Sequence, residues 1–292
     1  MSNLKTEIKK SVTNIFFLTI CGLAVVLSLI YTYEEIDTYF DYCKQVSFNE
    51  ILPQNTLSPT ISAYTLWLGG SKLENIKSSN VFFKVVLFSA VIPFSWSYCS
   101  DRRKSKKNKQ GFNDDIKYRI YKYIAVFISS GLITAIPLFI NLLLSLMFIP
   151  AVTPDPVYDI YYREFSNSIF GELFYSFPII YEMIYIFLYF LFCGLLGCIG
   201  YAFSLIIKNE AIAIVSPMLI LIISYHFSSK THIGYDFFSP ISYMNVADVM
   251  LRNYKTLFME MFIMFAFSLF VVIITRTKHK NNITDSILEK KV

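Results

Sequence analysis

The chain has 292 residues, a formal net charge of +5, 55% hydrophobic residues and only 16% charged residues. A mean hydropathy of +0.50 argues against a pair of soluble domains and favours a membrane protein. The deciding pattern is a series of apolar runs near or above the ~18 residues that cross a hydrocarbon core of about 30 Å.

The first 14 residues predict an interfacial helix. Leu4, Ile8 and Val12 line one face, and Lys5 and Lys9 lie off it, as in a helix along the inner leaflet. The apolar run that follows lacks a small-residue cleavage site and continues into "YTYEEIDTYF". We therefore expect an uncleaved first span and not a signal peptide.

Six apolar runs predict an all-α integral membrane protein, with residues 15–275 as one transmembrane domain. The fourth run is too long for one upright span, so we expect it to tilt, to break near Pro178 or to begin as an interfacial piece. The fifth run is short and contains Pro217. The six predicted spans are Ile15–Tyr33, Val81–Tyr98, Tyr123–Ile149, Phe174–Ile207, Ala211–His226 and Leu257–Thr275.

The distribution of lysine and arginine predicts the orientation. Eighteen of the 26 cations fall in residues 1–14, 99–122, 207–210 and 276–292, and seven fall in the opposite loops 34–80, 150–173 and 227–256. Because cations in short flanking segments stay in the cytoplasm, both termini, the connector 99–122 and the tail 276–292 are predicted to be cytoplasmic.

The connector holds nine of these cations, in "DRRKSKKNKQGFNDDIKYRIYKY". Topology and attraction to anionic lipid explain many such loops. Its second half also predicts a short amphipathic helix, with Asn113 as N-cap, acidic residues in the first turn, and Phe112, Ile116 and Ile120 at a four-residue spacing. A rigid connector of this kind is what a soluble partner would need in order to push on a transmembrane helix.

Charged residues inside spans are costly and usually face protein or water. Lys84 and Glu260 lie near the outer ends of their spans, where a long side chain reaches the interface. Glu182, flanked by Tyr181 and Tyr185, is the stronger candidate for contact with cargo, although a helix that breaks at Pro178 would place it at the headgroups. A carboxylate among tyrosines suits a cationic amphipathic cargo.

Signatures of catalysis and of metal binding are absent from the sequence. No G-x-x-x-x-G-K-[ST] motif occurs, so any ATP hydrolysis, with its ATP and Mg²⁺, is expected on a separate subunit. His226, His232 and Asp236 lack the short spacing of metal ligands. We predict no catalytic residue, no metal, no cofactor and no nucleic-acid partner for this chain.

The stretch "SWSYCSDRRKSKKNKQGFNDDIKYRIYKYIAVFISSGLITAIPLFINLL", with the "FFSPISYMN" segment and the six-span layout, resembles the permease subunits of type-2 ABC exporters from low-GC Gram-positive bacteria. Members of that family commonly have an acidic residue near the inner end of span two and a Gly-Thr-type turn, for which this chain has only Asp101 and Gly111.

This resemblance implies a multi-pass protein of a bacterial cell membrane that pairs with a second permease copy or a related permease and docks a cytoplasmic ATPase. It also implies that the connector carries the coupling helix. The implied docking residues are Gly111, Phe112, Asn113, Asp114, Asp115, Ile116, Tyr118, Arg119 and Tyr121.

Two other functions stay open. An ion-coupled secondary transporter would use Lys84, Glu182 and Glu260 as its coupling site, although the two halves of the sequence show no inverted repeat with interrupted helices. A membrane scaffold without transport activity would use the basic connector to recruit a soluble partner. The exporter, moving hydrophobic or amphipathic molecules such as antimicrobial or toxin-like peptides, is the function we expect.

Overall fold

A computed structural model describes residues 3–48, 61–70, 77–107, 115–162, 164, 166, 168–207, 209–231 and 254–289. Every regular element in this part of the chain is helical, which confirms the predicted all-α class. Four helices are long and apolar enough to cross a membrane. They are Ile15–Lys44 within α2 (Ile15–Phe48), α6 (Ile116–Phe148), α8 (Pro178–Ile206) and Tyr254–Thr275 within α11 (Tyr254–Glu289).

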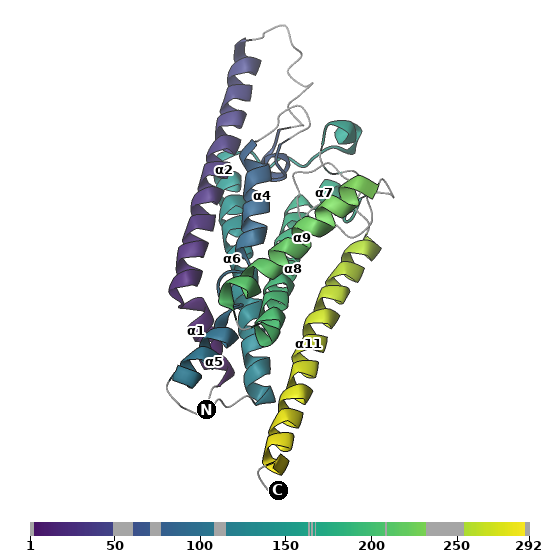
Figure 1. The fold of residues 1–292 in the computed structure, drawn as a ribbon. Helices are drawn as coiled ribbons and strands as arrows, with labels where there is room; N and C mark the ends of the chain where they lie inside the picture. Colours follow the sequence, from purple (N-terminus) through teal and green to yellow (C-terminus); the bar gives the residue numbers. More distant parts are fainter. Residues whose placement is uncertain are drawn as a thin grey trace.

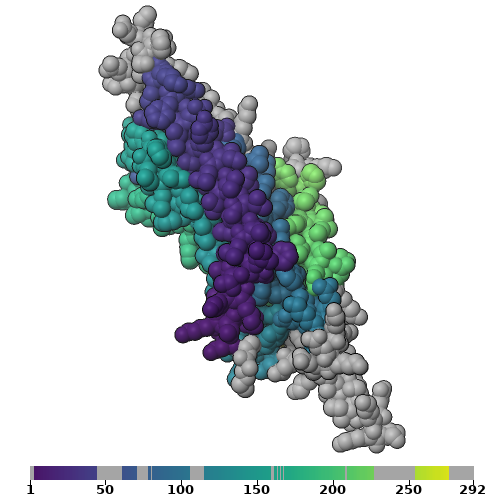
Figure 2. Space-filling model, turned by 90° about the vertical axis from the view of Figure 1, so that its left-hand side faces the viewer, coloured from purple at the N-terminus to yellow at the C-terminus, as the bar shows by residue number. Residues whose placement is uncertain are grey.

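The long helices run side by side along one axis, with α8 in contact with α6, α9 (Glu210–Thr231) and α11 (Figure 1). Seen from the side, α2 forms a continuous column along one face of the molecule (Figure 2). Large apolar side chains stay exposed on it, including Leu18, Leu23 and Ile30. A soluble monomer rarely exposes so much contiguous apolar surface, so this face indicates contact with lipid.

Small residues bring α6 and α8 close together. A Cβ added to Gly131 would lie 2.6 Å from the Phe190 carbonyl oxygen, and one added to Gly197 would overlap the Ser130 hydroxyl. In the sequence, Ser130 and Thr134, and likewise Gly131 and Ala135, are spaced by four, and such spacing of small residues predicts a close helix contact, either between subunits or within one. Here it joins two helices of the same chain, as small residues do in membrane bundles.

The predicted second span is not a continuous helix. It consists of α4 (Lys77–Ser89), a turn over residues 90–96 and α5 (Ser97–Lys107). Pro93 explains the break, because proline has no N–H for a helical bond and disfavours the α-conformation in the preceding residue. Side chains satisfy carbonyls in the turn, since Ser95 Oγ donates to the Val91 oxygen at 2.5 Å and Trp96 Nε1 to the Ile92 oxygen at 3.0 Å.

The other prolines have different effects. Pro178 is the first residue of α8, preceded by the short α7 (Gly171–Ser176), so of the three alternatives for the fourth run the structure has the break near Pro178. Pro137 and Pro217 lie inside α6 and α9 without ending them. The apolar part of α9, Glu210–His226, is shorter than the four long helices, so the length criterion supports four spans and leaves the six-span count a prediction.

The two ends of the bundle have different elements. α1 (Leu4–Val12), α5, the start of α6 and the end of α11 lie at one end, together with both chain termini (Figure 1). At the other end are α3 (Ala63–Trp67), the 3₁₀-helix η2 (Pro156–Tyr161) and α7. The two termini therefore lie at the same end of the bundle, and the cytoplasmic orientation of that end stays a prediction.

Residues 61–70 lie within a predicted outer loop, and all ten are buried. Ser62 begins α3 with a capping box: its hydroxyl accepts from the Thr65 N–H at 3.3 Å, and the Thr65 hydroxyl accepts from the Ser62 N–H at 2.9 Å. The chain leaves α3 through Gly69 and Gly70, whose φ angles of 98° and 85° favour glycine. This cap segment (residues 61–70) therefore packs into the bundle.

Candidate functional site

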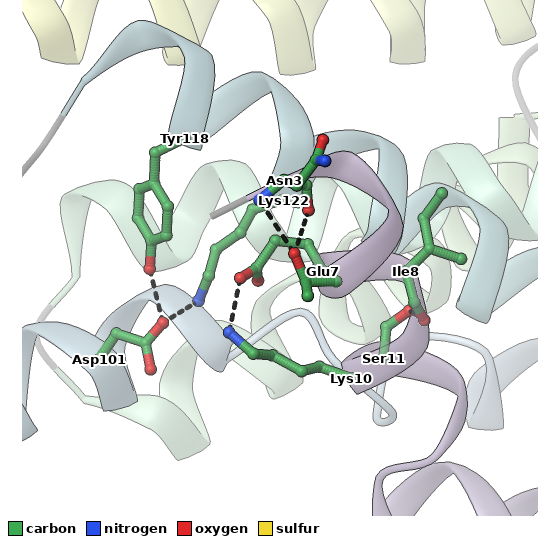
Figure 3. A network of polar contacts seen from close by, with 9 residues as sticks. Asn3, Glu7, Ile8, Lys10, Ser11, Asp101, Tyr118 and Lys122 are labelled. Atoms are coloured by element: carbon green, nitrogen blue, oxygen red, sulfur yellow. Dashed lines mark hydrogen bonds and ion pairs between the residues drawn. The ribbon is translucent and has the colours of Figure 1, made fainter. Parts of the chain in front are cut away.

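A polar cluster joins α5 to α6 at the end of the bundle that carries the termini (Figure 3). Asp101 Oδ2 accepts a hydrogen bond from the Tyr118 hydroxyl at 2.5 Å and forms an ion pair with Lys122 Nζ. The ammonium also lies 5.5 Å from the ring centroid of Phe94 and 5.2 Å from that of Tyr118. We call Asp101, Tyr118 and Lys122 the connector cluster.

The electrostatics of the connector cluster favour an ionised aspartate. The Lys122 side chain is 1% exposed and that of Asp101 is 41% exposed. Burial raises the pKa of the Asp101 carboxyl, but the charge and hydrogen bond of Lys122, together with the Tyr118 hydrogen bond, outweigh it. The pKa of Asp101 therefore lies below its ordinary value.

The N-terminal helix adds a second acidic group beside the connector cluster. The predicted helix is confirmed as α1, which packs against α6. Its Glu7 is buried and forms an ion pair of 2.8 Å with the exposed Lys10. Glu7 also attracts Lys122 electrostatically. Figure 3 shows the Lys122 side chain passing beside Glu7 on its way to Asp101.

Arg119 ties the same part of α6 to α11 and α8. Its side chain is buried, and Nη1 donates to the Thr275 hydroxyl at 2.9 Å and to the Val272 carbonyl oxygen at 3.3 Å. The Tyr201 hydroxyl of α8 donates to the Arg119 carbonyl oxygen at 3.3 Å. The guanidinium also lies over the Tyr98 ring of α5, 5.7 Å from its centroid. Three helices are thus held to the start of α6.

The predicted docking residues divide into three groups. Gly111, Phe112, Asn113 and Asp114 lie outside the described residues. Asp115 is the exposed N-cap of α6, and Ile116 and Tyr121 are half-buried in its first turns. Tyr118 and Arg119 make the internal contacts given above. In the described part of the connector, the expected amphipathic helix is the beginning of α6 itself and not a separate element.

Sequence reasoning missed the internal role of Arg119 and Lys122, although a signal was present. Both residues are in phase with Val126 and Ile133 at spacings of three, four and seven, and these apolar residues are buried on the inner face of α6. The same periodicity that predicts the apolar face therefore includes the two cations.

A second polar group lies in the other half of the bundle. Glu35 of α2 is fully buried, and its Oε2 accepts hydrogen bonds from Asn141 Nδ2 at 3.0 Å and Ser145 Oγ at 2.7 Å on α6. Asn141 Nδ2 also donates to the Thr32 hydroxyl at 2.8 Å. Sequence analysis placed Glu35 in an outer loop, but it falls in phase with Ser28 and Thr32, which are also buried.

Glu182, the predicted cargo residue, is also fully buried, in the second turn of α8. Its position after Pro178 does not expose it to headgroups, because Glu35 of α2 and Tyr64 of the cap segment lie within electrostatic range. Tyr181 and Tyr185 are buried as well, with ring centroids 4.7 Å apart. The structure thus puts the three predicted residues in the protein interior.

The other charges of the predicted coupling site are arranged differently. Lys84 is exposed on α4, whereas Glu182 and Glu260 are buried, so the three do not form one buried site.

The histidines and the aspartate considered as metal ligands are not brought together in the described structure. His226 is exposed at the end of the apolar part of α9, and His232 and Asp236 lie outside the described residues. Within the described residues, no group of three or more His, Cys, Asp or Glu side chains suits a metal ion.

An apolar cavity of about 230 Å³ lies among α8, α9 and α11. Leu196, Pro217, Leu221, Met264 and Phe267 contribute to its lining. Its chemistry suits an aliphatic or aromatic group and not an ion.

Comparisons of the chain with protein-family models, with curated proteins and with solved structures find no match.

Proposed function

We propose that the chain is the transmembrane permease subunit of an ATP-binding-cassette exporter in a bacterial cell membrane. It would have six spans with both termini in the cytoplasm, pair with a second permease copy or a related permease, and be driven by a separate ATPase that binds ATP and Mg²⁺. Four long apolar helices, and two termini at the same end of the bundle, support this arrangement.

One observation carries the proposal: the start of α6 is fastened to several helices at once. The connector cluster holds it to α5, and Arg119 bonds α11 while its carbonyl accepts from α8. A force applied to the exposed residues at the start of α6 would therefore move these helices together, because a buried, hydrogen-bonded contact resists bending. A soluble ATPase needs such a lever to open and close a path through the membrane.

The cargo would be hydrophobic or amphipathic, such as an antimicrobial or toxin-like peptide. The apolar cavity among α8, α9 and α11 supports apolar cargo, since its lining offers dispersion contacts and few hydrogen bonds. The predicted cargo path at Tyr181, Glu182 and Tyr185 lies elsewhere on α8, and none of these residues lines the cavity.

The test is ATP hydrolysis by the ATPase subunit that we propose as the partner, co-purified with the permease and reconstituted in lipid. The variant carries Asp114→Arg, Asp115→Arg and Ile116→Asp, and it keeps the buried connector cluster intact. We expect this variant to lose ATPase binding or the stimulation of hydrolysis while it remains folded. Asp155→Arg, an exposed change at the opposite end of the bundle, is the control and should leave hydrolysis unchanged.

Unchanged association and hydrolysis in the triple variant would overturn the proposal. An ion-coupled secondary transporter would then predict cargo movement that follows an ion gradient without ATP. A scaffold would predict partner recruitment without any movement of cargo. Flux measured in vesicles, with ATP and with an imposed ion gradient in separate runs, distinguishes these two functions.

A further inference from the structure

We infer that Glu182 is a proton-binding site inside the helical bundle, with Glu35 as the neighbouring carboxylate that controls its proton affinity. The ligand is a proton, which the Glu182 carboxyl holds in the folded conformation described above. This property goes beyond the ATP-driven role and does not rest on it, since it concerns two side chains remote from the connector.

The first argument is the burial of Glu182 without compensation. The residue is fully buried, and both of its carboxyl oxygens lack a hydrogen-bond partner among the described residues. An ionised carboxylate in such a place has lost its hydration and gained no donor. The cost is several kcal/mol or more, and proteins avoid it by neutralising the group.

The second argument is the set of groups around Glu182. Glu35 from α2 repels a negative charge on it, and Tyr64 from α3 is a neutral phenol. On α8 itself the neighbours are Tyr181 and Tyr185. Among the side chains that the structure describes, the other acidic groups on helices packed against α8 are Glu172 of α7, which is exposed, Asp101 of α5, Glu210 of α9 and Glu260 of α11. In the described residues, no cation contributes a compensating charge at Glu182.

The third argument is the contrast between the two carboxyl groups. Glu35 Oε2 accepts hydrogen bonds from Asn141 and Ser145, and such donors stabilise a carboxylate. Glu182 has no donor of this kind among the described residues. Two neighbouring carboxyl groups in unequal environments differ in proton affinity, so the one without donors keeps its proton more firmly than the one with donors.

A metal ion fits this place less well than a proton. Ca²⁺ takes six to eight oxygen ligands and Mg²⁺ requires near-octahedral geometry. The described residues offer no group of three acidic, histidine or cysteine side chains. The start of α8 is closely packed, with the Phe174 and Tyr181 ring centroids 5.2 Å apart. A proton needs neither extra ligands nor room.

The experiment is infrared spectroscopy of the full chain in lipid over a series of pH values. A protonated carboxyl group has a C=O stretch that is separate from the bands of the carboxylate and of the amide backbone. We expect this band in the unmodified protein at pH 7 and expect Glu182→Gln to remove the part of its intensity that comes from one carboxyl group, since the buried Glu35 and Glu260 give bands of their own when protonated. Glu172→Gln, which removes an exposed carboxyl ten positions earlier in the sequence, is the matched control and should leave the band unchanged.

Glu35→Gln tests the role of the neighbour. Removal of its negative charge makes ionisation of Glu182 easier, so the Glu182 band should disappear at a lower pH than in the unmodified protein. Should Glu182→Gln not fold, Glu182→Asp gives the assignment instead, because a carboxyl on a shorter side chain shifts the band without abolishing it.

A spectrum of Glu182→Gln identical to that of the unmodified protein at pH 7 would overturn the inference, since Glu182 would then be ionised. A band in Glu182→Asp that does not shift would overturn it as well. Neither result bears on the exporter proposal, because the measurement needs no ATPase, nucleotide or cargo. Conversely, loss of ATPase docking would leave the infrared result unchanged.

Discussion

The Lys122 ammonium of α6 and the Asp101 carboxylate of α5 form an ion pair in which the lysine is almost wholly enclosed and the aspartate reaches solvent. The two residues are 21 positions apart, near the two ends of the connector 99–122. Removal of the aspartate would leave a buried ammonium without its anion, whereas removal of the lysine would leave a carboxylate that is partly hydrated.

Asp101→Asn should destabilise the protein, because it leaves a buried ammonium without its bonded anion. We expect a loss of up to about 3 kcal/mol in the free energy of unfolding, at the low end for a buried pair since Asp101 is partly hydrated. Unfolding in detergent micelles measures it. Arg103→Gln, which breaks the more exposed pair with Glu210, should cost less than about 1 kcal/mol. Equal losses in the two variants would contradict the assigned burial.

The contribution of Asp101 should depend on pH at the acidic end. Its folded-state pKa lies below the unfolded value of about 3.9, so the stabilisation is fully present above that value. It is lost as the pH falls through the folded-state pKa, where the carboxylate becomes protonated. Melting temperatures of the unmodified protein and of Asp101→Asn should therefore converge as the pH is lowered below about 4. A gap that stays constant down to acid denaturation would refute this.

The contact between α6 and α8 should not tolerate a side chain at Gly197. Gly197→Leu would force the helices apart at Ser130, and overpacking of this kind costs about 1–3 kcal/mol or more. Gly22→Leu is the matched control, because a Cβ at Gly22 has no described atom within 4 Å. Thermal unfolding of both variants in the same detergent tests the pair. If Gly22→Leu is as unstable as Gly197→Leu, the loss of stability does not come from the contact between α6 and α8.

The asparagine that bonds Glu35 should also be sensitive to substitution. Asn141→Leu removes one of the two donors to Glu35 Oε2 and leaves the Thr32 hydroxyl without its donor, which we expect to cost about 1–3 kcal/mol. Thr19→Ala serves as control, since its hydroxyl bonds only carbonyls of its own helix in the described structure. The same unfolding assay applies, and a neutral Asn141→Leu would mean that water already satisfies Glu35.

Apolar periodicity and length predicted much of the fold. The all-helical class, the N-terminal helix and the break at Pro178 all follow from local rules: helical spacing of apolar residues and the missing N–H of proline. The second span was predicted as continuous because its composition is apolar throughout. Pro93 predicts a kink in this span, but the sequence pattern does not show that the helix ends there in a turn whose carbonyls bond to nearby side chains.

Most of the candidate sites could not be predicted in this way, because they depend on contacts between distant segments. Glu35 lies 106 residues from Asn141, and Arg119 lies 156 residues from Thr275. Sequence rules that consider one residue at a time place charged side chains outside the protein interior and treat each carboxylate within a span separately. They singled out Glu182 as a cargo contact, which stays a prediction, and only the fold brings Glu35 near it and encloses Lys122.

The turn after α4 has a consequence for how the chain enters the bilayer during synthesis. The 13 residues of α4 rise about 20 Å, short of a hydrocarbon core of about 30 Å. The turn that follows α4 packs against α8. Ser95 lies against Gly200, and Cys99 Sγ donates to the carbonyl oxygen of Ser204, 105 residues later. Lipid alone cannot satisfy these turn groups. We therefore expect the α4–α5 segment to reach its final depth only after α8 has been synthesised and has packed against the turn.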